Sequence, residues 1–205
     1  MPRARSLSDH AVLERAADVF WRNGYAATSL RDLTQATGLS ASALYHRFRD
    51  KDGLFVEALQ RYADDGLRQR LAGLAATTDP LQAIASLLEQ LARASAQDAQ
   101  RRGCLLVNTV LDGAPMSEAA REVARARLGE IEVFFAQRLR QAVAMGLLAP
   151  DTDTDGRASA LLGAVLAVRV LARLDDDATR MQAVVTQALA GLQRTAADAR
   201  PVPRA

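Results

Sequence analysis

Apolar residues recur at intervals of three and four along most of this 205-residue chain, which is the period of an amphipathic α-helix. No segment shows the strict alternation of apolar and polar residues that is typical of a half-buried β-strand. The pattern therefore predicts an all-α protein. We expect about nine helices, over residues 9–22, 28–38, 40–47, 50–71, 80–97, 103–112, 117–145, 156–174 and 177–194.

Several of these helices begin and end at residues that favour a helix terminus. Ser8 precedes the first helix as an N-cap, and Ser29 with Asp32 has the spacing of a capping box. Gly38 follows the second helix, and Pro80 stands in a first turn, where its missing N–H costs nothing. These local signals support the helix boundaries that the periodicity predicts.

Residues 28–51, TSLRDLTQATGLSASALYHRFRDK, form the most informative stretch of the chain. They read as two short helices joined by a glycine turn, followed by a cluster of cations. A helix-turn-helix of this kind lays its second helix in the major groove of DNA. The sequence therefore predicts a DNA-binding regulator.

The stretch from Ala16 to Phe55 resembles the DNA-binding domain of the TetR/AcrR family of transcriptional regulators. The matching residues are Phe20, Gly24-Tyr25, Thr28, Gly38-Leu39-Ser40, Leu44-Tyr45-His46-Arg47-Phe48 and Lys51. The resemblance implies a homodimer with two DNA-binding heads and a C-terminal ligand pocket that controls their spacing. It also implies repression that a small effector relieves.

Three residues are expected to contact the DNA backbone. Thr28 lies near the start of the second helix, where free N–H groups and the helix dipole favour a phosphate, although N-capping is the alternative reading. By resemblance, Tyr45 and Lys51 contact phosphates as well. Arg47 and Arg49 are either further phosphate contacts or solvated charges.

The exposed face of the third helix is expected to read the bases. Serine can serve several bases, whereas alanine can only touch a thymine methyl, so DNA shape contributes to selectivity. The predicted readers are Ser40, Ala41, Ser42 and His46, with Arg31 from the second helix. Arg3 and Arg5 can enter the minor groove as an arm, or belong to a weakly electrostatic tail.

The last two predicted helices carry too much apolar surface for one side to be solvated. Residues 156–174 are apolar on more than one face, and such a helix must be covered on both sides. A second copy of the chain is the simplest cover. We therefore expect residues 156–194 to form half of an intersubunit four-helix bundle. The predicted domains are a helix-turn-helix domain over 1–50, an effector-binding and dimerisation domain over 51–195, and a tail over 196–205.

Five residues are expected to contact an effector. Cys104 follows Arg101, Arg102 and Gly103 at a predicted helix start, which favours a reactive thiolate; the alternative is a small buried apolar side chain. The run from Arg101 is also similar to family members with Gly-Cys-Leu here, some of which respond to electrophiles or oxidants. The other candidates are the amide Asn108, the adjacent pair Phe134 and Phe135, and Arg169. Arg169 either pairs with an acid across the dimer or binds an anion.

Aromatic residues narrow the class of effector. Of the nine in the chain, all but Phe134 and Phe135 lie within residues 20–62. A pocket for large planar cations normally uses stacked rings. We therefore expect a small, aliphatic or reactive effector.

Net charge and cysteine content restrict the possible classes of protein without identifying one. The formal net charge is only +2, so the placement of the cations matters more than their sum, and Lys51 is the only lysine. One cysteine permits no intramolecular disulfide, which fits a reducing cytoplasm. The start, MPRARSLSDH, lacks an apolar leader, and no run of 18 apolar residues predicts a membrane span.

No catalytic or metal-binding constellation is recognisable, so neither an enzyme nor a cofactor is expected. The run from Asp151 to Gly156 mimics the start of a calcium loop, but the twelfth position is Leu162 rather than glutamate. The preferred function is a ligand-released homodimeric repressor. The alternatives are a thiol-based sensor that uses Cys104, an all-helical enzyme without a recognisable motif, and a helix-turn-helix that docks protein.

Overall fold

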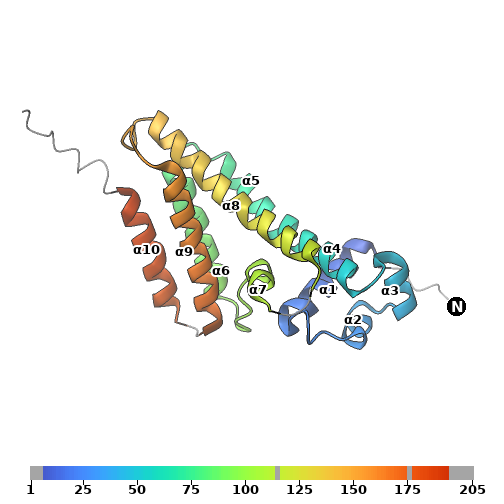
Figure 1. Ribbon diagram of the computed structural model, residues 1–205. Coiled ribbons are helices and arrows are strands. Elements are labelled where there is room, and N and C mark those ends of the chain that lie inside the picture. The colour runs from blue at the N-terminus through green and yellow to red at the C-terminus, as the bar shows by residue number, and fades with distance from the viewer. Residues whose placement is uncertain (1–6, 114–115, 175–176, 194–205) are drawn as a thin grey trace, which may run out of the picture. The chain divides into compact units, whose positions relative to one another are not determined.

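The computed structural model describes residues 7–113, 116–174 and 177–193, and within these ranges the chain forms α-helices and one π-helical segment without a β-strand. The all-α prediction is confirmed. The elements in chain order are α1 (Asp9–Asn23), α2 (Leu30–Thr37), α3 (Ala41–Phe48), α4 (Lys51–Ala63), η1 (Asp64–Arg68), α5 (Gln69–Ala75), α6 (Pro80–Ala96), α7 (Leu105–Leu111), α8 (Glu118–Ala144), α9 (Thr154–Leu174) and α10 (Ala178–Gln193) (Figure 1).

The predicted helix caps are present. The Ser29 hydroxyl accepts from the Asp32 amide at 3.2 Å, and the Asp32 carboxylate accepts from the Ser29 amide at 2.8 Å, which closes the capping box on α2. The Ser8 hydroxyl caps α1 by accepting from the Ala11 amide at 3.3 Å. Gly38 ends α2 in the left-handed region, with φ of 70°. These caps depend on neighbours within one turn, which is why the sequence alone predicted them.

The single helix expected over residues 50–71 is divided in the structure. It comprises α4, the π-helical turn η1 and α5, and it continues to Ala75. A π-helical turn inserts extra backbone into a helix without ending it. Apolar periodicity cannot reveal such an insertion, because the pattern still reads as helical on both sides.

The chain folds into two compact units, each made of two separate stretches of the chain. Unit 1 comprises residues 1–69 and 104–127, and unit 2 comprises residues 70–103 and 128–205. In unit 1, α4 packs on α1, and Phe55 of α4 lies 4.7 Å from Phe20 and 5.1 Å from Tyr25 between ring centroids. The helix after residue 50 therefore shares one core with the three helices before it. The functional division of the chain stays a prediction, and its tail lies outside the described residues.

Unit 2 is built on three helices, α6, α9 and α10, that lie side by side (Figure 1). Leu161, Val165 and Val168 of α9 are buried in this group, and Phe135 of α8 is completely buried. Apolar positions at helical spacing face the core, as the sequence predicted. None of the helices formed by the described residues has the length and apolarity that a membrane span requires.

Candidate nucleic-acid interface

Two buried anchors set the orientation of α3. Leu44 and Phe48 are almost completely buried, so the opposite side of this two-turn helix faces outward. Ser40 caps the helix by accepting from the Ala43 amide at 3.2 Å. The Gly38 turn joins α3 to α2, as a helix-turn-helix requires.

The outward side of the α2–α3 pair carries the residues predicted to touch DNA. Tyr45 is 37% exposed, and Ser40, Ser42, His46 and Arg31 are exposed as well. Ala41 is half-buried at the start of α3. The structure thus leaves the predicted base readers accessible, although their contacts with particular bases stay predictions.

Thr28 has a different local role from the one that the sequence indicated. Its side chain is only 2% exposed, and its hydroxyl donates to the Gly24 carbonyl at 2.7 Å. Ser29, not Thr28, is the N-cap of α2, so the capping interpretation of Thr28 is wrong. A phosphate contact at this position would have to use the backbone N–H rather than the hydroxyl.

Lys51 is held in place by an aromatic ring to which the sequence analysis assigned no chemical role. Lys51 is the first residue of α4, and its ammonium lies 4.5 Å from the centroid of the Tyr25 ring. Burial lowers the pKa of Lys51, and the nearby Asp52 carboxylate partly opposes that change. Burial and a hydrogen bond to Asp52 raise the pKa of the Tyr25 phenol well above its ordinary value. The only lysine of the chain is therefore a positioned cation rather than a freely moving one.

Arg47 connects α3 to the start of α1 within unit 1. Its guanidinium forms an ion pair with Asp9 at 3.0 Å and donates to the Leu7 carbonyl at 3.3 Å, which joins α3 to the start of α1. Arg47 remains exposed on the protein surface, so this ion pair adds a structural role, and its contact with a phosphate stays a prediction. Arg49 is exposed, with φ of 67°, and Arg3 and Arg5 lie outside the described residues.

Cys104 lies at the N-cap of α7 and is 8% exposed. The Tyr62 hydroxyl is 3.8 Å from its Sγ atom. Asn108, one turn further along, is half-buried, and its backbone amide donates to the Cys104 carbonyl at 2.8 Å. The thiol is thus shielded from solvent and held beside a phenol. Both readings of Cys104, reactive and buried, remain compatible with this geometry.

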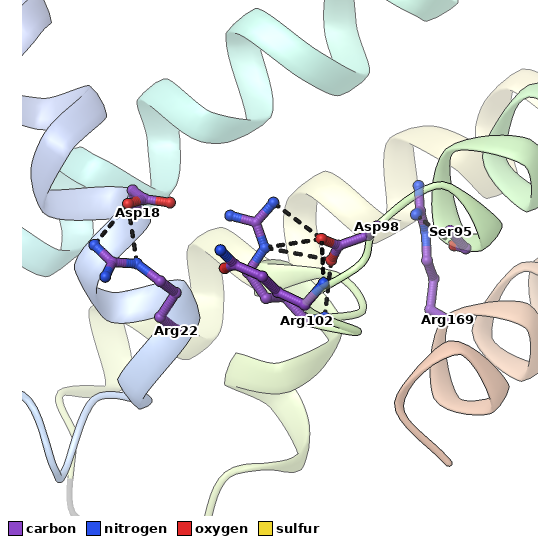
Figure 2. A network of polar contacts seen from close by, with 7 residues as sticks. Asp18, Arg22, Ser95, Asp98, Arg102 and Arg169 are labelled. Carbon is purple, nitrogen blue, oxygen red and sulfur yellow. Dashed lines mark hydrogen bonds and ion pairs between the residues drawn. The ribbon is translucent and has the colours of Figure 1, made fainter. Parts of the chain in front are cut away.

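Arg102, which precedes Cys104 by two residues, has its partner within unit 2. The Arg102 guanidinium forms an ion pair with Asp98 at 3.2 Å, and the Arg102 amide donates to the same carboxylate at 2.8 Å (Figure 2). Burial alone would raise the pKa of Asp98, but hydrogen bonds and charge from Arg102 outweigh it and hold the pKa below its ordinary value. The carboxylate therefore stabilises the folded protein in its charged form.

We expect Asp98→Asn to lower Tm by about 3 °C at pH 7 and by much less at pH 3. The folded-state pKa lies below the unfolded value of about 3.9, so the stabilisation is complete above that value and is lost as the pH falls through the folded-state pKa. Thermal unfolding of both proteins across this pH range measures the effect. An equal difference in Tm at both pH values would contradict the assignment.

The remaining effector candidates lie in unit 2. Arg169 donates to the Ser95 hydroxyl at 2.8 Å, and Ser95 is buried, so within the protomer its partner is a hydroxyl (Figure 2). Its pairing with an acid across a dimer stays a prediction. Phe134 and Phe135 are both buried, with ring centroids 5.9 Å apart. Effector contacts through these three residues remain predictions.

A groove of about 570 Å³ lies between α6 and α10 in unit 2. Glu89 and Arg93 of α6 and Thr179 and Gln182 of α10 contribute its polar lining. Sequence reasoning missed this groove, because its residues are ordinary solvent-facing positions on their own helices. Among the described residues, no group of three His, Cys, Asp or Glu side chains is arranged to hold a metal ion.

Family models match both parts of the chain. Residues 12–58 match the model of bacterial regulatory proteins of the tetR family. Residues 80–188 match the model of the tetracyclin repressor-like C-terminal domain. The first match contains α2, α3 and Lys51, and the second contains α6, α9 and the first part of α10.

Individual relatives agree with the family models. The HTH-type transcriptional repressor ComR of Escherichia coli (strain K12) is 32% identical over 152 residues, which are 74% of this chain and 72% of ComR. A cysteine mutant of the TetR family transcriptional regulator CifR, solved with 26-bp double-strand operator DNA, has a TM-score of 0.82 and 36% identity. That likeness covers 92% of this chain and 98% of CifR. The reduced form of Escherichia coli NemR, at 20% identity and a TM-score of 0.77, shares the fold.

Proposed function

The chain belongs to the TetR family of bacterial regulatory proteins, and on that premise we propose that it is a homodimeric cytoplasmic repressor released from its operator by a small effector. Binding to operator DNA and regulation of transcription are properties that it shares with its relatives. Dimerisation, the effector and the cytoplasmic location are the parts that we add.

The observation that carries the proposal is the outward side of α3. Buried Leu44 and Phe48 turn Ser42, Tyr45 and His46 toward solvent, and Lys51 follows directly at the start of α4. Each protomer would place this side in one half-site, with the two half-sites about one helical turn, roughly 34 Å, apart. An effector that binds the released state more tightly than the DNA-bound state would then relieve repression.

Footprinting of the purified protein on DNA upstream of its own gene tests the proposal. We expect protection of a pseudo-palindrome, with an affinity that falls steeply as salt concentration rises. Addition of candidate small aliphatic or electrophilic compounds should remove the footprint. A protein that protects no DNA at low salt would contradict the proposal.

An incompletely covered apolar stripe on α9 supports the homodimer. It repeats every four residues, and its members are Leu162, Leu166, Val170 and Leu174. Val170 is 39% exposed and Leu174 is 65% exposed, although the opposite side of the same helix is buried. Such a stripe on a helix that already packs on α6 and α10 suits a second copy of the same helix.

We expect Val170→Glu to raise the dimer dissociation constant by at least about 100-fold, because it would bury a carboxylate without a partner. Sedimentation velocity across a range of protein concentrations measures the change. Glu substituted for Gln182, an exposed residue of α10, is a control that should leave the dimer intact. A Val170→Glu protein that sediments as the wild type does would exclude this stripe from the interface.

A thiol-based sensor that uses Cys104 is a second candidate. Two observations favour it: the Tyr62 hydroxyl lies 3.8 Å from Sγ, and the similar regulator CifR was solved on operator DNA as a cysteine mutant. Cys104 is the single cysteine of this chain, so any thiol response must come from it.

We expect Cys104→Ser to bind operator as the wild type does but to lose release by N-ethylmaleimide. The thiolate adds to the maleimide double bond, and the carbanion then takes a proton from water. Electrophoretic mobility shift, with mass spectrometry to count one adduct per chain, measures both effects. Equal release of the two proteins would show that Cys104 is only a buried side chain.

A further inference from the structure

Two helical segments pass from unit 1 into unit 2. One is α4–η1–α5, which leaves unit 1 after Gln69, and the other is α8, which leaves it after Arg127. Inside unit 1 these segments are joined at two places. The Ser117 amide donates to Asp52 at 3.4 Å, and Arg127 forms an ion pair with Asp64 at 3.3 Å. The order of the contacts along both segments shows that they run in the same direction.

The contact at Asp64 lies at the first residue of the π-helical turn. The Oδ1 atom of Asp64 is shielded from solvent and faces two guanidinium groups, Arg127 at 3.3 Å and Arg68 at 3.4 Å. Arg127 is itself only 15% exposed. Single π-helical turns inside α-helices are uncommon and are often found at functional sites. Here a charge from a second helix contacts the residue where the backbone changes from α to π.

The contact at Asp52 lies beside the cation expected to touch DNA. The Asp52 carboxylate accepts from the Ser117 amide and also from the Tyr25 phenol. The Tyr25 ring in turn lies 4.5 Å from the Lys51 ammonium. A displacement at the start of α8 would therefore change the position of Lys51 through the Asp52 carboxylate and the Tyr25 ring.

We propose that the first turns of α8 link unit 2 to the DNA-contacting edge, with Arg127 and Asp52 as positioning residues and η1 as the element that changes. With the Arg127–Asp64 pair intact, the π-helical turn is held and α4 keeps Lys51 in place. A displacement of α8 breaks the pair and lets η1 change its helical state. This inference rests on the proposed function and names the route by which an effector signal travels.

Linkage allows a test that needs no effector, because a site coupled to DNA binding must respond to DNA in return. Amide hydrogen exchange is measured on the full-length protein with and without operator DNA. In the wild type, we expect DNA to slow exchange in residues 64–68 and in residues 128–144 of α8. In Arg127→Gln, we expect the DNA-dependent change in residues 128–144 to fall at least fivefold, with DNA still bound at saturating concentration.

Matched variants separate coupling from folding. Arg125→Gln removes an exposed cation of α8 that pairs with Glu118 and Glu122, and it should keep the wild-type response. Asp64→Asn should behave as Arg127→Gln does, and the double variant should be no worse than either single variant. If Arg127→Gln does not fold, Asp64→Asn, which removes the other charge of the same pair, carries the test.

Two results would overturn the route. One is a wild type that binds operator but shows no DNA-dependent exchange in residues 128–144. The other is a folded Arg127→Gln or Asp64→Asn protein that keeps the full response. A wild type that binds no operator at all would instead contradict the proposed function, and a mobility shift made beforehand distinguishes that case.

Discussion

Replacement of Lys51 by glutamine is expected to weaken operator binding at least about 100-fold. A hydrogen bond to a charged group contributes about 1.5–3 kcal/mol, and a homodimer loses two of them, while each 1.4 kcal/mol is a factor of ten. Because the Tyr25 ring positions the ammonium at 4.5 Å, little conformational entropy is lost when it meets a phosphate. Quantitative mobility shift at fixed salt measures the loss.

The salt dependence of the same variant identifies the kind of contact. One phosphate contact removed from each protomer should reduce the slope of log affinity against log salt by about two for the dimer. The loss should also be similar for any operator sequence, because a phosphate carries no base information. Arg93→Gln, which removes a cation of α6 in unit 2, is the control and should change neither quantity. An unchanged slope in Lys51→Gln would remove Lys51 from the DNA contacts.

Replacement of Phe55 by alanine is expected to destabilise unit 1 by about 3–5 kcal/mol, the usual cost of removing a buried phenylalanine ring. Phe55 is 1% exposed and contacts both Phe20 and Tyr25. Tyr25 is also the ring beneath Lys51, so operator binding should be lost together with stability. Urea unfolding followed by circular dichroism measures the change.

Val133→Ala is the control for this prediction. Val133 is 55% exposed on α8, so its truncation should change the free energy of unfolding by less than about 0.5 kcal/mol. A Phe55→Ala protein as stable as the Val133→Ala protein would show that the aromatic cluster is not the core of the head. Retained operator affinity in a destabilised Phe55→Ala protein would instead separate the cluster from the placement of Lys51.

Expectations about single helices agree closely with the structure. The capping box of Ser29 and Asp32, the left-handed Gly38 and the proline at the start of α6 are all present. Leu44 and Phe48 lie four residues apart on one side of α3, and their burial leaves the outer side of the helix exposed. Each of these features depends on residues within one or two turns of each other, and such neighbours are visible in a sequence.

Expectations about single side chains agree less well where distant residues are involved. Thr28 is a local exception: its hydroxyl donates to the Gly24 carbonyl only four residues earlier, it does not cap α2, and its phosphate contact stays a prediction. Arg47 was considered a phosphate contact or a solvated charge, and the structure adds an ion pair with Asp9, 38 residues away, that the sequence did not indicate. Arg169 was expected to pair with an acid or an anion, and within the protomer it meets the Ser95 hydroxyl. The partners of Arg47 and Arg169 are decided by how the chain folds back on itself.

The order of the helices, their caps, the buried sides and the helix-turn-helix motif were determined by the amino-acid sequence alone, because periodicity and capping act over a few consecutive residues. Only the tertiary structure decided that Tyr25 would lie beneath Lys51, that Asp64 would meet Arg127 and that a π-helical turn would interrupt the fourth helix. The physical reason is that side chains distant in sequence compete for the same partners, and the packing of whole helices settles that competition.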